Sequence, residues 1–94
     1  MKMKYIVTER EENGNLIEEI FVFDVNINHD CFGELVGKFK NSTWGRWVRV
    51  QRKPISAGFV EIRPHDGTMA CYGESETLKL KSRGDEDTKL LTGV

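Results

Sequence analysis

The segment from Trp44 to Lys53 concentrates cations and tryptophans, and its sequence is WGRWVRVQRK. Arginine and lysine bind phosphate and carboxylate groups, and an aromatic face can stack on a flat ring. The segment therefore predicts a binding surface for an anionic ligand. A second interpretation makes the tryptophans half-buried packing residues and the cations partners of nearby acids.

Five residues are the candidate ligand-binding site. Arg49, Lys53 and Arg63 would hold the phosphates of a small anionic ligand, and Trp47 or Phe59 would stack on its base. A compact nucleotide suits this set because it needs only a local positive pocket with an aromatic wall.

Charge is distributed unevenly along the chain, although the net charge is only −1. Acids dominate the first third, whereas Glu61 is the single acid between Lys38 and Arg63. The acidic third would repel a long polyanion, so extended nucleic acid is a weaker interpretation than a small ligand. Strands from the two regions could also pair and neutralise each other's charges.

The sequence carries no catalytic or metal signature that we can identify. His29, Cys31, His65 and Cys71 lack the Cys-x-x-Cys spacing of a zinc site, and nothing fixes a His65–Cys71 pair for nucleophilic chemistry. We therefore expect no metal, no cofactor and no enzymatic activity. The two cysteines are expected to be reduced and buried.

The 94 residues are expected to form one domain, residues 1–94. The apolar stretch Tyr5-Ile6-Val7 is too short for a signal peptide or a membrane span, so the expected location is the cytoplasm.

A β-hairpin is expected at the start of the chain. Lys4–Arg10 and Leu16–Val25 have strand patterns, and Asn13-Gly14 between them is a turn dipeptide. Both faces of the second strand are apolar, which predicts a central place in the sheet.

A helix is predicted over about residues 29–40, followed by a strand over Trp44–Lys53. Pro54 and the small residues Ser56-Ala57-Gly58 are expected to break that strand, which resumes at Phe59–Arg63. In the resumed strand Val60 and Ile62 would point inward and Phe59 outward.

The last third predicts short strands and a helix. Strands are expected at Thr68–Tyr72 and Thr77–Lys81, joined by a bend, with Leu78 and Leu80 inward. Ser82 to Asp85 has the spacing of a capping box, and the helix that follows should end near Gly93. The predicted fold class is α+β, with an antiparallel sheet of about five or six strands, one helix packed across it and a short C-terminal helix.

The function predicted from these features is non-enzymatic capture of a small anionic ligand, with a nucleotide signal as one case. The short length and the lack of an enzyme signature resemble small bacterial and bacteriophage accessory proteins, a class that includes inhibitors and nucleotide-sequestering proteins. The alternative is a protein-interaction module or inhibitor that uses the acidic hairpin or the Trp-rich strand against a macromolecular partner. An exposed sheet edge would also let two copies pair as a homo-oligomer.

Overall fold

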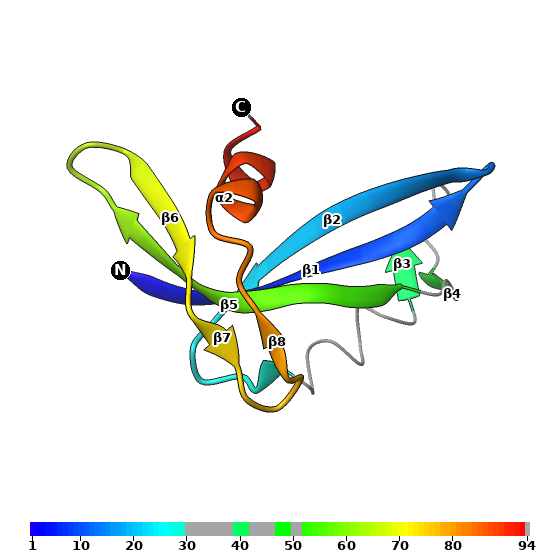
Figure 1. The fold of residues 1–94 in the computed structure, drawn as a ribbon, viewed down its shortest axis with the longest axis horizontal. Helices are drawn as coiled ribbons and strands as arrows, with labels where there is room; N and C mark the ends of the chain where they lie inside the picture. Colours follow the sequence, from blue (N-terminus) through cyan, green and yellow to red (C-terminus); the bar gives the residue numbers. More distant parts are fainter. Residues whose placement is uncertain (30–38, 42–46, 50–51, 94) are drawn as a thin grey trace.

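The computed structural model describes residues 1–29, 39–41, 47–49 and 52–93, which form antiparallel strands and a short C-terminal helix (Figure 1). The main sheet has the strand order β2-β1-β5-β6. Its strands are β1 (Lys2–Glu12), β2 (Asn15–Phe23), β5 (Lys53–Arg63) and β6 (Thr68–Tyr72); two further pairs are β3 (Phe39–Asn41) with β4 (Trp47–Arg49) and β7 (Glu74–Ser75) with β8 (Leu80–Lys81), and the helix is α2 (Asp85–Thr92). Among these residues no helix has the length and apolar character needed to cross a membrane.

The N-terminal hairpin is confirmed, but among the described strands β2 lies at the edge of the main sheet and β1 is an inner strand. Asn13 and Gly14 both have positive φ, 52° and 81°, as this tight turn requires. β1 lies between β2 and β5 in the sheet. Both faces of β2 contact the core, because Ile20 packs against one cluster and Phe23 belongs to the other. A strand that is apolar on both faces can therefore lie at the edge of the described sheet.

Alternating residues of β1 build two small cores on opposite faces of the sheet. Tyr5 and Val7 join Val60 and Cys71 in one cluster, and α2 covers it with two leucines. Ile6 belongs to the other cluster, against which Leu78 and Leu80 pack from the β7–β8 segment. The inward position predicted for these two leucines is confirmed, although the strand predicted at Thr77–Lys81 is shortened to β8.

The strand break predicted at Pro54 is wrong, because β5 runs without interruption from Lys53 to Arg63. The register with β1 shifts between Val7 and Thr8, which places one extra residue, Ile55, in β5 as a bulge. β6 pairs with β5 only from Phe59 onward. Within the described sheet, Pro54 therefore has a neighbouring strand on one side, where proline is tolerated.

The helix predicted over residues 29–40 falls largely on residues 30–38, which lie outside the described residues. Its predicted end is wrong, because Phe39–Asn41 form strand β3 and pair with β4. At Phe39–Asn41, strand pairing with Trp47–Arg49 outweighs the helical spacing of the apolar residues.

The C-terminal helix is confirmed, including its end at Gly93, whose N–H donates to the Lys89 carbonyl. The predicted cap is wrong: Gly84 is the N-cap, and no side chain caps the helix. Ser82 Oγ instead accepts a hydrogen bond from the Gly84 N–H, and its hydroxyl donates to the Tyr5 oxygen, whose own proton goes to Asp87. The Ser82 side chain, which the local pattern assigned to the helix cap, therefore binds Tyr5, a residue distant in the sequence.

A buried carboxylate, Asp87, joins α2 to the sheet. Its Oδ2 accepts hydrogen bonds from the Tyr5 hydroxyl at 2.5 Å and from the Arg83 backbone N–H at 3.0 Å. Its Oδ1 accepts from Arg83 Nε at 2.7 Å, and the same guanidinium reaches Glu18 of β2. Asp87 therefore joins α2 to β1 and to the segment before the helix, and Arg83 extends this network to β2.

The environment of Asp87 favours its charged form. Burial opposes ionisation, but the hydrogen bonds from Tyr5 and Arg83 outweigh it and lower the pKa of Asp87. Burial and the Asp87 hydrogen bond raise the pKa of Tyr5 far above its usual range. The phenol therefore acts as a permanent donor to the carboxylate.

We expect Asp87→Asn to destabilise the fold by about 2 kcal/mol at neutral pH, because hydrogen bonds to a charged acceptor are lost. A lowered folded-state pKa gives stability that is present above the unfolded pKa of about 3.9 and is lost as pH falls through the folded-state value. The difference between wild type and variant in urea unfolding should therefore shrink below about pH 4. Asp85→Asn, an exposed site on the same helix, is the control; a difference independent of pH would contradict this account.

Candidate functional site

Four side chains form a row across the main sheet. Lys4 of β1 lies opposite Phe23 of β2 and opposite Phe59 of β5, and Phe59 lies opposite Tyr72 of β6. Directly opposed residues project from the same face of an antiparallel sheet. The register therefore places one cation among three aromatic rings.

His29 packs over this row from the loop that follows β2. Its ring meets Phe23 and Phe59 edge-on, with centroids 5.4 and 5.9 Å apart. Its Nε2 lies 2.9 Å from the Gly58 carbonyl oxygen, so this nitrogen donates the hydrogen bond. Phe59 also lies 6.1 Å from Tyr72 in a tilted arrangement. These contacts hold the rings in place without a ligand.

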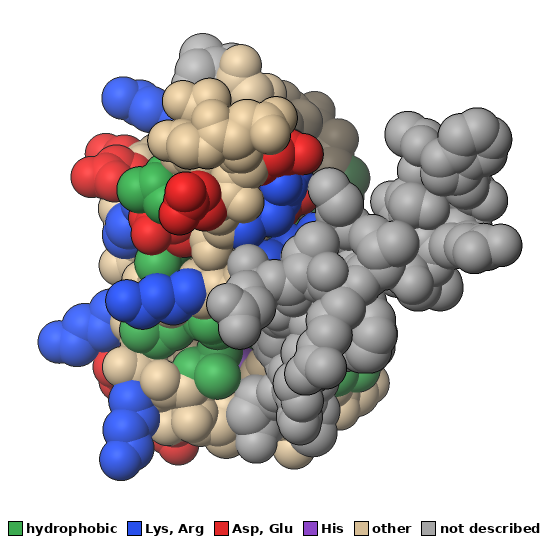
Figure 2. Space-filling model, turned by 90° about the vertical axis from the view of Figure 1, so that its right-hand side faces the viewer, with side chains coloured by type: hydrophobic (Ala, Val, Ile, Leu, Met, Phe, Trp, Pro, Cys, Tyr) green, Lys and Arg blue, Asp and Glu red, His purple; other side chains and the backbone are tan. Residues whose placement is uncertain are grey.

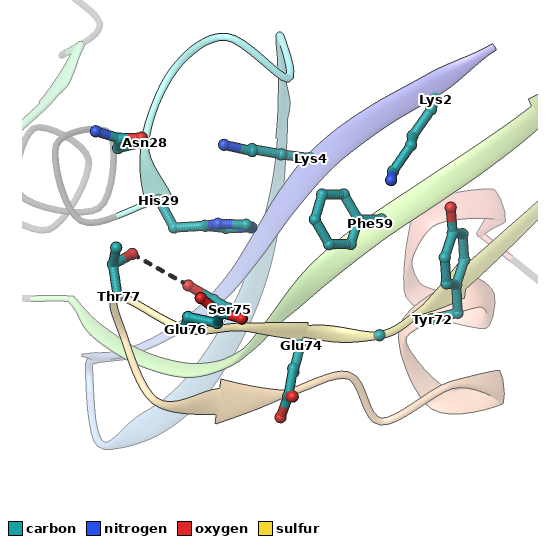
Figure 3. Close-up of a pocket in the computed structure, with 11 residues that line it drawn as sticks. Lys2, Lys4, Asn28, His29, Phe59, Tyr72, Glu74, Ser75, Glu76 and Thr77 are labelled. Carbon is teal, nitrogen blue, oxygen red and sulfur yellow. Dashed lines mark hydrogen bonds between the residues drawn. The ribbon is translucent and has the colours of Figure 1, made fainter.

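A pocket of about 450 Å³ opens over this row (Figure 3). Its walls differ in chemistry: two lysines of β1 lie on one side, rings of β5 and β6 form the base, and the segment after β6 supplies two carboxylates. These residues are Lys2, Lys4, Phe59, Tyr72, Glu74 and Glu76. The volume is typical of small-molecule sites, which span roughly 300 to 1,000 Å³.

The two lysines project from one face of β1, because they are two residues apart in a strand. Lys2 Nζ lies 4.2 Å from the centroid of the Phe59 ring, and Lys4 Nζ donates to the Ile27 carbonyl at 2.9 Å. Figure 3 shows both amines on the same side of the pocket. Two cations beside a partly exposed ring can bind an anionic group attached to a flat ring.

The structure distributes the five predicted site residues over several places. Phe59 lines the pocket and is partly buried there, on the sheet face opposite to that of the buried Val60. Lys53 and Arg63 lie at opposite ends of the 11-residue β5, roughly 30 Å apart at about 3.3 Å per residue. Trp47 and Arg49 belong to β4, and their side chains lie outside the described part of the structure.

Sequence reasoning missed the other pocket residues. The available signal was the spacing of Lys2 and Lys4, which puts two cations on one strand face. That signal is weak by itself, because only the pairing of β1 with β5 and β6 brings Phe59 and Tyr72 beside them.

Two acids of the N-terminal hairpin form ion pairs with arginines of the same chain. Glu18 binds Arg83, and Glu19 binds Arg10 and Arg52. Burial opposes the charge of Glu19, but hydrogen bonds from these two arginines lower its pKa. Figure 2 shows basic and acidic side chains next to one another over the described part of that face. The interpretation of mutual neutralisation therefore holds for the Glu19–Arg52 pair.

Comparison of the chain with protein-family models, with curated proteins and with solved structures gave no match. Over the described residues, no group of three or more His, Cys, Asp or Glu side chains could hold a metal ion. The pocket side chains are therefore the basis for a proposed function.

Gly73 allows the chain to pass closely under the base of the pocket. Its φ is +80°, and a Cβ at this position would lie 3.1 Å from Cδ2 of Phe59. Its carbonyl accepts the Ser82 N–H at 2.9 Å. Ser82 in turn binds the Tyr5 hydroxyl, so the base of the pocket is connected to the Asp87 cluster.

We expect Gly73→Ala to destabilise the fold by more than Gly67→Ala. Gly67 has a similar φ of +71°, but a Cβ added there would meet nothing within 4 Å, so it measures the conformational penalty alone, about 1 to 2 kcal/mol. Gly73→Ala adds the contact with Phe59, which should also shift the ring proton resonances of that residue. Equal losses in urea unfolding, with unchanged Phe59 resonances, would show that this contact is unimportant.

Proposed function

We propose that this protein is a non-enzymatic binding protein that captures a small anionic ligand, with a nucleotide as the best-fitting class. The observation that carries the proposal is the position of Lys2 and Lys4 on one strand face beside the rings of Phe59 and Tyr72, within one pocket. Phosphate groups bind ammonium groups, and a nucleobase stacks on aromatic rings.

Binding would change the position of Lys2. Its ammonium lies over the Phe59 ring, where a stacked base would also lie. A phosphate would draw this ammonium toward itself and expose the ring face to the base. The anionic and flat parts of a ligand would therefore support each other's binding. Capture of this kind requires affinity and no group positioned for chemistry.

The alternative of a protein-interaction module has one supporting observation. Val25 and Ile27, in the loop that borders the pocket, are 38% and 41% exposed. Exposed apolar side chains beside a pocket are typical of protein contacts as well. The acidic hairpin lends this alternative less support, because Glu18 and Glu19 already bind arginines of the chain.

We expect the double variant Lys2→Ala/Lys4→Ala to weaken nucleotide binding by at least about 100-fold, because each charged hydrogen bond contributes roughly 1.5 to 3 kcal/mol. Native mass spectrometry with a nucleotide panel would identify a ligand and its stoichiometry, and isothermal titration calorimetry would measure the affinity.

The matched control is Lys53→Ala/Arg63→Ala, which removes the same charge from the two ends of β5. The proposal expects near wild-type affinity for this control. If nucleotide affinity falls strongly in the control but not in Lys2→Ala/Lys4→Ala, the ligand binds near Lys53 or Arg63 instead of in the pocket. If the wild-type protein binds no anion in the panel, the result would favour the alternative of a macromolecular partner.

A further inference from the structure

Two glutamates line the pocket across from its lysines, and negative charge on that side limits what the pocket can bind. Glu74 and Glu76 are exposed at the rim. In the described part of the chain neither carboxylate has a hydrogen-bond or ion-pair partner. A bare phosphate would be attracted by one wall and repelled by the other. A better ligand has an anionic end and, some distance away, a group that donates hydrogen bonds.

Glu76 lies in a turn whose backbone is fixed by the residues on either side of it. The preceding Ser75 is 2% exposed, and its Oγ accepts the Leu78 N–H at 3.2 Å. The Ser75 and Thr77 hydroxyls lie 3.3 Å apart. Figure 3 shows Glu76 beside these two residues, whereas the Glu74 carboxylate points away from Lys2 and Phe59. Of the two glutamates, Glu76 is therefore the candidate for contact with a ligand.

An ionised carboxylate only accepts hydrogen bonds, and its two oxygens lie side by side. Its best neutral partner has two N–H donors side by side. Guanine has this arrangement on its Watson–Crick edge, in the ring N1–H and the 2-amino group. Adenine has a donor beside an acceptor, and the acceptor would face the second carboxylate oxygen.

We propose that the pocket binds a guanine nucleotide, an inference that rests on the function proposed above. Lys2 and Lys4 would bind the phosphate, and the guanine ring would stack on Phe59 and Tyr72. Glu76 would accept hydrogen bonds from N1–H and the 2-amino group. This assignment gives both charged walls of the pocket a partner on one ligand.

The test is calorimetric titration of wild-type protein, Glu76→Gln and Glu74→Gln with guanosine, adenosine and inosine monophosphates. We expect the wild type to bind the guanosine compound at least about fivefold more tightly than the adenosine compound, since a bidentate base contact gives discrimination of this order. Inosine monophosphate, which keeps N1–H but lacks the 2-amino group, should bind with intermediate affinity. Glu76→Gln should lose the preference, and Glu74→Gln should keep it.

Each other result has a distinct meaning. Equal wild-type affinities for the guanosine and adenosine compounds would overturn the guanine assignment and leave anion capture intact. A preference that survives in Glu76→Gln, with thermal unfolding unchanged, would overturn the role of Glu76. If the wild type binds none of the three nucleotides, nor inorganic phosphate, then anion capture fails and the guanine assignment fails with it.

Discussion

The buried Asp87 carboxylate is the constraint on which the arrangement of the described fold depends. An eight-residue helix is not stable alone in water, so α2 needs a tertiary anchor. Tyr5 and Arg83 provide it by donating to Asp87. The Tyr5 hydroxyl also binds Ser82, whose N–H holds the carbonyl of Gly73 under Phe59. The helix anchor and the base of the pocket are therefore parts of one hydrogen-bonded chain.

The difference between local and long-range contacts explains which structural predictions from the sequence succeeded. Local signals were sufficient for the Asn13-Gly14 turn, for the strand Thr68–Tyr72 and for the helix end at Gly93. They failed at Ser82, whose spacing indicated a helix cap, because its hydroxyl binds a residue 77 positions earlier. They failed at Pro54 because its neighbours in the sheet, and not its own conformational preference, decide whether a strand continues.

The site was predictable only in part, for a related reason. A cationic aromatic segment is visible in composition, and it led to Phe59, which lines the pocket. Composition could not show that Lys53 and Arg63 lie at opposite ends of one strand. Nor could it show that the β1–β5 register brings Lys4 beside Phe59, more than 50 residues away in the sequence. Binding pockets of small sheets are made by such pairings between distant strands.

The proposed ligand site is the sheet face that bears Lys4, Phe59 and Tyr72. The most direct test is a titration of ¹⁵N-labelled protein with guanosine monophosphate, followed by amide chemical shifts. Binding at this face should produce saturable shifts at Lys2, Lys4, Phe59 and the 72–77 segment. Shifts confined to Trp47–Lys53, or no shifts at millimolar ligand, would contradict it.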